Sequence, residues 1–244
     1  MMKWLLALCC VLSFSAVGQA QITGFVKLTG KLPDPVEIDM SGMPACANMH
    51  PDPVYFEDVV VDPDTGALQN VIVSIKHDSS QPLGDEHKIK TPAVLSQKGC
   101  IFVPHVLAVM IGEPIIIKNE DTCAHDVHPL CQLNPQFKMD EDGKDNGTPV
   151  PPNEMPKVPE TFQIKCDIHG WMGAWMSVFD HPYFAVTGAD GKYSIDTKGL
   201  PDGTYTIDFW QETYGMKEVK ATVTDHKATV NCSFDADTDT GNEQ

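Results

Sequence analysis

Residues 161–179 read TFQIKCDIHGWMGAWMSVF and contain three potential metal-binding side chains in close succession. A β-prone run leads into Cys166, a short loop carries His169 and Met172, and a second β-prone run follows. A thiolate, imidazoles and a weak axial thioether are the donors that suit copper in both of its charge states. The loop therefore supplies three of the four donors of a mononuclear copper site within seven residues.

A fourth donor is expected from residues 115–128, which read IIIKNEDTCAHDVH. This segment runs from an apolar strand through a polar turn to His125 and His128. His125 is the preferred ligand because His128 is followed by a proline and so resembles the exit of a loop. For the axial position Met172 competes with Met176, and Met172 is preferred because Met176 is expected inside the following strand.

Together these segments resemble the cupredoxin family, and the spacing Cys-x2-His-x2-Met is similar to that of amicyanin within it. The resemblance covers roughly residues 90–180. It implies a Greek-key β-sandwich with one mononuclear type 1 (blue) copper site, whose ligands would be His125, Cys166, His169 and Met172. Many cupredoxins have Asn after the first histidine, where this chain has Asp126. A carboxylate in that position can still accept backbone N–H bonds.

A second pattern lies toward the C-terminus. Residues 187–195 (TGADGKYSI) and 199–207 (GLPDGTYTI) each place Asp-Gly in a tight turn ahead of an alternating strand. They resemble the carboxypeptidase regulatory-like family, a small transthyretin-like β-sandwich, and residues 22–27 and 68–75 resemble its opening strands. Because the matching segments flank the copper motif, we expect the copper domain to be inserted into this sandwich; two domains in tandem are the simpler alternative.

Short segments rich in Val, Ile, Phe, Thr and Tyr recur between Gly, Pro and Asp clusters along the whole chain. This pattern predicts an all-β protein with little helix. The predicted organisation begins with a signal peptide at residues 1–20. A discontinuous regulatory-like sandwich follows at residues 21–77 and 183–234, with a cupredoxin-like domain at residues 78–182 between its two parts. Residues 235–244 form a disordered acidic tail.

The N-terminus is typical of a secretory signal peptide. Lys3 precedes an apolar run, and small residues end at Ala20. The apolar run is too short to span a bilayer, and no later stretch approaches the required length of about 20 apolar residues. We therefore expect a protein secreted across the inner membrane, periplasmic or extracellular, without a transmembrane segment.

The formal net charge is −17 at pH 7, and the chain contains no arginine. Nucleic acid is therefore excluded as an expected partner. The negative surface could steer a basic redox protein toward the chain, or it could simply keep an exported protein soluble. The sequence has no recognisable hydrolase triad and no Gly-rich phosphate loop, so we do not expect an enzyme.

Six cysteines follow the predicted signal peptide. If Cys166 binds a metal, at least one of the other five is unpaired or pairs with another chain. The sequence leaves open the disulfide connectivity of Cys46, Cys100, Cys123, Cys131 and Cys232.

The function predicted from these patterns is that of an exported blue copper protein that transfers single electrons. An apolar surface around an exposed His169 would meet the redox partner. The alternative is an extracytoplasmic copper carrier, or a structural binding module that has lost its metal.

Overall fold

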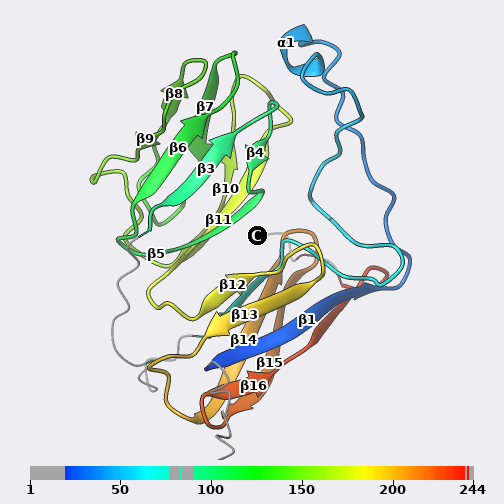
Figure 1. The fold of residues 1–244 in the computed structure, drawn as a ribbon, viewed down its shortest axis with the longest axis vertical. Coiled ribbons are helices and arrows are strands. Elements are labelled where there is room, and N and C mark those ends of the chain that lie inside the picture. The colour runs from blue at the N-terminus through cyan, green and yellow to red at the C-terminus, as the bar shows by residue number, and fades with distance from the viewer. Residues whose placement is uncertain (1–19, 77–82, 84–90, 240, 242–244) are drawn as a thin grey trace, which may run out of the picture.

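The computed structural model describes residues 20–76, 83, 91–239 and 241, and Figure 1 shows their arrangement. Strands dominate, and the only helix in this part of the chain is the four-residue α1 (Pro44–Ala47). The predicted all-β class is confirmed. The predicted signal peptide lies outside the described residues except for its last position. Among the residues described, no helix has the length and apolar character to cross a membrane.

The strands form where apolar side chains alternate with polar ones. In β13 (Lys192–Asp196), Tyr193 and Ile195 are buried while the residues between and beside them are exposed. The same alternation along β14 (Gly203–Gln211) buries Tyr205, Ile207 and Phe209 on one face. Successive side chains of a strand point to opposite faces, so each of these strands presents one apolar face to a core.

Two sheets enclose the first core. One has the order β13-β1-β16, with β17 also pairing with β1, and the other has the order β12-β2-β14-β15. The remaining bounds are β1 (Gln21–Thr29), β16 (Lys227–Thr229), β17 (Cys232–Asp235), β12 (Phe184–Val186), β2 (Ile72–Ile75) and β15 (Gly215–Val223). Their inner faces meet in one cluster that includes Val26, Val73, Ile195, Ile207 and Phe209.

Two further sheets enclose a second core, and both contain a parallel pair: β5 with β11, and β3 with β6. Their strand orders are β5-β11-β10-β7-β8 and β4-β3-β6-β9. The bounds are β3 (Ala93–Gln97), β4 (Phe102–Val103), β5 (Val106–Met110), β6 (Ile115–Asn119), β7 (His125–Pro129), β8 (Met139–Glu141), β9 (Thr148–Pro149), β10 (Glu160–Lys165) and β11 (Gly173–Phe179). The core between them includes Leu95, Phe102, Ile117, Phe162 and Ile164.

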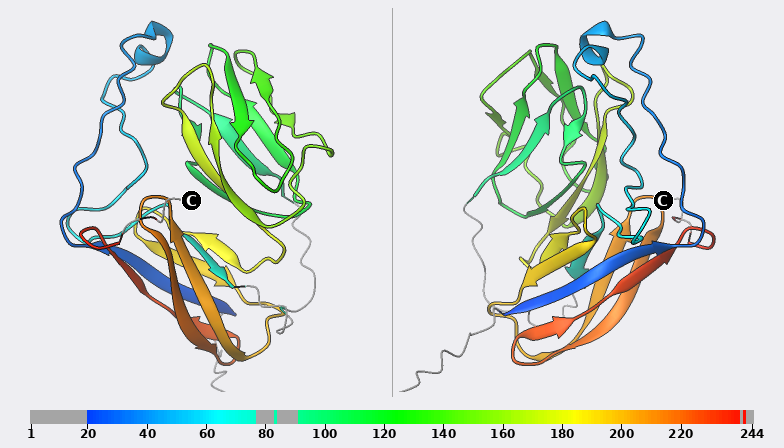
Figure 2. Two further views of the ribbon diagram at one scale, coloured as in Figure 1. Left: turned by 180° about the vertical axis from the view of Figure 1, so that it is seen from behind. Right: turned by 45° about the vertical axis from the view of Figure 1, so that its right-hand side comes forward.

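In chain order, β1 and β2 of the first sandwich precede the second sandwich, and β12 to β17 follow it. A long excursion joins β1 to β2, and Figures 1 and 2 show it extending past the second sandwich and returning. Ile38, Met40 and Cys46 in this excursion belong to the second core cluster. A disulfide between Cys46 in α1 and Cys100 fastens the excursion there. Residues 38–56 thus pack with the second sandwich, although the sequence placed them in the first.

The acidic C-terminal segment is ordered further than the sequence predicted. Asp235 is the last residue of β17, and the backbone N–H of Ala236 donates to Thr29 at 2.9 Å. Asp239 accepts from the backbone N–H of Asp235 at 2.6 Å and pairs with Lys217 at 2.5 Å. The prediction of disorder from residue 235 is wrong for residues 235–239, because these backbone and charge contacts continue the pairing of β17 with β1.

The Cys46–Cys100 disulfide closes a loop across a sequence separation of 54 residues. A crosslink over that length stabilises a fold by about 4 kcal/mol in the chain-entropy view. Replacing both cysteines by alanine should therefore lower the free energy of unfolding by about this amount, as measured by denaturant titration of the mature protein. Equal unfolding midpoints for the variant and the wild-type protein would show that the excursion does not need the crosslink.

Candidate metal centre

The four predicted ligands come from two neighbouring parts of one sheet. His125 is the first residue of β7, Cys166 directly follows β10, and His169 and Met172 lie in the turn between β10 and β11. β10 pairs antiparallel with β7 on one side and with β11 on the other. This pairing brings the start of β7 and the β10–β11 turn to the same end of the sandwich.

Three of the four predicted side chains form one buried group. The Nδ1 atoms of His125 and His169 are 3.0 Å apart, and Cys166 Sγ is 3.8 Å from His169 Nδ1. The donor atoms of all three residues lie within 4.8 Å of one another. The exposed fractions are 0% for His125, 2% for Cys166 and 1% for His169, so the group is shielded from water.

These separations fit donors that share one metal ion. With bond lengths of about 2.0–2.1 Å to nitrogen and about 2.3 Å to sulfur, as for zinc, a trigonal ion places nitrogen and sulfur about 3.8 Å apart. Two such nitrogens lie about 3.1–3.5 Å apart for bond angles of about 100–120°. The observed nitrogen–sulfur separation matches, and a small movement of one imidazole ring brings the two nitrogens into the same range.

Met172 shapes the loop through its backbone. Its N–H donates to the carbonyl of His169 at 2.9 Å, and its carbonyl accepts from the N–H of Cys166 at 3.2 Å. These two bonds close the loop, so that Cys166 and His169 are held close together. Met172 is 2% exposed, and Met176 lies within β11 and is 4% exposed. The axial role of Met172 stays a prediction.

Asp121, which the sequence did not identify as part of the site, orients His125. Its Oδ2 lies 2.9 Å from Nε2 of His125, and its two carboxylate oxygens accept the backbone N–H groups of Gly99 and Cys100 at 2.7 and 2.8 Å. A carboxylate in this position holds the proton on Nε2 and leaves the Nδ1 lone pair free for a metal. The available signal was an acidic residue four positions before His125, in the polar turn.

Asp126 joins the two ligand segments, as expected of a carboxylate in this position. Its Oδ1 accepts the backbone N–H of Asp167, the residue after Cys166, at 2.8 Å. Its Oδ2 lies 3.2 Å from Nζ of Lys138, and its carbonyl accepts from the side chain of Gln97 at 3.1 Å. Asp126 is fully buried, and Lys138 places a positive charge beside its carboxylate.

His128 belongs to a separate network. Its Nδ1 lies 3.1 Å from a carboxylate oxygen of Asp167, which also pairs with Lys165 and Lys138. Hydrogen bonds from Lys165 and then His128 hold the pKa of Asp167 far below its usual range. His128 therefore pairs with a charged carboxylate at the surface and lies away from the buried group.

The protonation of His169 suits a metal ligand. Burial, followed by the neighbouring His125, lowers its pKa below the usual value of 6.5. The ring is thus neutral near pH 7, and neutral imidazole is the form that binds metals. Its Nε2 is buried without a hydrogen-bond partner.

The expectation that His169 is exposed is wrong. The excursion between β1 and β2 covers this end of the sandwich, and Cys46 lies close enough to His169 for their donor atoms to fall within one 4.8 Å group. The ring of Trp171 lies 5.3 Å from the ring of His169 between centroids. Trp171 is half-buried, and its indole N–H donates to the carbonyl of Cys100 at 2.9 Å. Trp171 therefore lies between the buried histidine and the surface.

The cysteines near the centre differ in state. Cys46 and Cys100 form the disulfide, so neither offers a thiolate, and Cys166 is free. Cys123 is also free, with Sγ 3.6 Å from Cys100 Sγ and 3.7 Å from His125 Nε2. It lies on the Nε2 side of His125, opposite the nitrogen that faces His169. Cys131 and Cys232 are free and buried elsewhere.

No known protein family and no curated protein matches the chain. Parts of several solved structures are similar to it. A Cu-containing nitrite reductase from Thermus scotoductus SA-01 is 20% identical over 41% of this chain and 26% of its own, with a TM-score of 0.33. A methionine-to-alanine mutant of amicyanin in the Cu(I) state is 14% identical over 36% of this chain and 82% of its own, with a TM-score of 0.31. A purple cupredoxin from Nitrosopumilus maritimus is 13% identical over 36% of this chain and 99% of its own, with a TM-score of 0.30. The chain spans about a quarter of the nitrite reductase.

The contact between Asp121 and His125 generates a prediction about metal affinity. Asp121→Asn weakens the acceptor that fixes the His125 tautomer, so copper affinity should fall by about 10–100-fold. Competition against a chelator of known affinity measures this change. The matched control is Asp140→Asn, because Asp140 is an exposed carboxylate on β8. Equal copper affinity in both variants would contradict the assigned role of Asp121.

The buried carboxyl of Glu141 on β8, next to β7, generates a prediction about pH. Burial, followed by a hydrogen bond with Asp145, raises the pKa of Glu141 from 4.5 to about 8. The folded state therefore holds a proton on Glu141 that the unfolded chain releases near pH 4.5. The stabilisation is fully present below about pH 4.5 and is lost as the pH rises toward 8. The unfolding midpoint of the metal-free wild-type protein should fall between pH 5 and 8 more steeply than that of Glu141→Gln. Parallel pH profiles would contradict this prediction.

Proposed function

We propose that this chain is an exported type 1 copper protein that transfers single electrons between redox proteins. The proposed ligands are His125, Cys166, His169 and Met172. The observation that carries the proposal is the buried group of two imidazoles and one free thiol at the end of the second sandwich.

The donor set suits one-electron chemistry. Bound copper would supply a centre that changes charge by one, and a thiolate with two imidazoles accommodates both charge states. The chain holds these donors through strand pairing, the backbone bonds of Met172 and the Asp121 contact with His125. Fixed donors rearrange little when the charge changes, which favours rapid electron transfer.

Burial separates this centre from catalytic metal sites. A catalytic site keeps a position open for water or substrate. Here His125, Cys166 and His169 are each at most 2% exposed, and the excursion between β1 and β2 lies over them. The arrangement favours a carrier of electrons over a centre that binds a substrate.

The aromatic contact between His169 and Trp171 gives the proposed route for the electron. Trp171 lies against the buried histidine and also lines a surface cavity. A redox partner that docks over this cavity would approach the centre through Trp171. The net charge of −17 favours a basic partner.

We also propose two domains, with the copper-binding sandwich inserted into the carboxypeptidase regulatory-like one. Two separate core clusters support this division. The element order supports insertion, because strands of the first sandwich lie on both sides of the second. The excursion between β1 and β2 is then an arm of the outer domain that covers the centre of the inserted one.

The optical spectrum of the copper-loaded mature protein tests the proposed function. Oxidised protein should show an intense visible thiolate-to-copper charge-transfer band, and Cys166→Ser should abolish it. Cys131→Ser is the matched control, because Cys131 is also a free, buried thiol of the second core. A colourless wild-type protein, or a band that survives Cys166→Ser and disappears in Cys131→Ser, would sink the assignment.

A further inference from the structure

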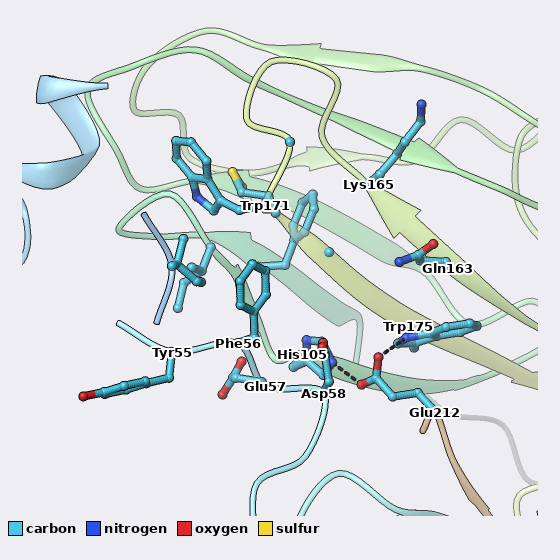
Figure 3. A pocket seen from close by; sticks show the side chains of 16 residues that line it. Tyr55, Phe56, Glu57, Asp58, His105, Gln163, Lys165, Trp171, Trp175 and Glu212 are labelled. Carbon is cyan, nitrogen blue, oxygen red and sulfur yellow. Dashed lines mark hydrogen bonds and ion pairs between the residues drawn. The ribbon is translucent and has the colours of Figure 1, made fainter. Parts of the chain in front are cut away.

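A cavity of about 390 Å³ lies where the two sandwiches and the excursion meet. Its walls come from the excursion at Tyr55–Asp58, from the turn before β5, from β10 and β11, and from the end of β14. Figure 3 shows aromatic rings on one side and a group of carboxylates with one histidine on another.

Three metal-binding side chains converge in this cavity. The donor atoms of Asp58, His105 and Glu212 lie within 4.8 Å of one another. His105 Nε2 forms a hydrogen bond with the Glu212 carboxylate. In Figure 3 the Asp58 side chain lies next to this pair. None of the three is among the proposed copper ligands.

Hydrogen bonds hold the three residues in place, two of them through Trp175. The carbonyl of His105 accepts the backbone N–H of Trp175 at 2.8 Å. The second oxygen of Glu212 accepts the indole N–H of the same Trp175 at 2.6 Å. The carbonyl of Asp58 accepts from the side-chain amide of Gln211, the residue before Glu212, at 2.5 Å. The His105 ring and the Glu212 carboxylate are thus positioned before any ligand arrives, and the backbone of Asp58 is fixed beside them, which lowers the cost of binding a ligand.

The charge around the group is negative. Glu57 lines the same cavity, and Lys165 is the only lysine among the residues that line it. Burial lowers the pKa of His105, but the hydrogen bond and charge of Glu212, followed by Glu57 and Asp58, outweigh burial and raise it. The carboxylates therefore create a potential that attracts a cation to this position.

We propose that Asp58, His105 and Glu212 form a second metal site, which binds a divalent cation of the zinc type and is independent of the copper centre. One imidazole and two carboxylates are ligands that Zn²⁺ and Co²⁺ accept. Binding replaces the His105–Glu212 hydrogen bond and releases the proton held between them. Water from the cavity could complete the coordination of such an ion, because all three residues line the cavity.

The site joins three segments that are distant in the sequence. Asp58 belongs to the excursion, His105 to the second sandwich, and Glu212 to the first. An ion bound there stabilises their arrangement, because it binds the folded chain and not the unfolded one. Its role is to lock the two sandwiches and the covering arm together beside Trp171.

The test is a titration of the mature, wild-type protein with Co²⁺ after one equivalent of copper has been added. We expect one equivalent of Co²⁺ to bind with weak visible d–d absorption and without thiolate-to-cobalt charge transfer, because the site contains no cysteine. His105→Gln and Glu212→Gln should weaken this binding about tenfold or more. Asp190→Asn, which alters an exposed carboxylate of the first sandwich, should leave it unchanged.

Asp58→Asn keeps the test decisive if the other two variants fail to fold, because Asp58 is exposed and its replacement disturbs no core. It should also weaken Co²⁺ binding, while the copper spectrum stays as in the wild-type protein. Absence of a stoichiometric Co²⁺ site in the wild-type protein would overturn the proposal. So would Co²⁺ affinity that is the same in folded Asp58→Asn and Glu212→Gln as in Asp190→Asn, which would leave the His105–Glu212 contact as an ion pair only.

Discussion

The antiparallel pairing of β10 with β7 and β11 is the constraint on which the rest of the centre depends. It brings His125 and the Cys166–Met172 loop to one end of the second sandwich, although His125 and Cys166, the nearest of the proposed ligands, are 41 residues apart in the sequence. Asp126 then ties the two segments by accepting the N–H of Asp167, and Asp121 fixes the His125 ring. Each contact uses a backbone N–H or an imidazole N–H. The donors are therefore positioned by the hydrogen bonding of the fold itself, without help from a bound ion.

The excursion between β1 and β2 changes how such a centre communicates with its surroundings. It adds Ile38, Met40 and Cys46 to the core of the second sandwich and leaves His169 only 1% exposed. In the proposed function, a redox partner would exchange electrons through the groups that surround the centre, of which Trp171 contacts the His169 ring directly. The cavity beside Trp171 also contains the His105–Glu212 contact, so the proposed electron route and the junction of the two sandwiches lie side by side. The proposed docking surface and the junction of the two sandwiches therefore share one cavity.

The sequence predicted what local spacing and alternation determine. The strands around Cys166 follow from alternating side chains, and the spacing of Cys166, His169 and Met172 places them in one short loop. Asp121 lies four positions before His125, which was a usable signal, but its contacts with Gly99 and Cys100 could not be predicted, because only the folded sheet brings their turn near. Six cysteines allow 15 pairings, so the Cys46–Cys100 bond was also beyond reach. The burial of His169 depends on the excursion between β1 and β2, whose apolar residues could have packed with either core. His105 and Glu212 form their hydrogen bond although they are 107 residues apart and belong to different sandwiches.

X-ray absorption at the copper edge of the loaded, oxidised protein tests the central claim most directly, because it counts the atoms bound to the metal. The expected result is one short bond to sulfur, at about 2.3 Å or slightly less, and two imidazole nitrogens at about 2.0 Å. Among the residues that the structure describes, Cys166 is the only free thiol in one donor group with both histidines, so a single short sulfur bond is expected. A shell of nitrogen and oxygen alone, or two short sulfur bonds that recruit Cys123, would contradict it.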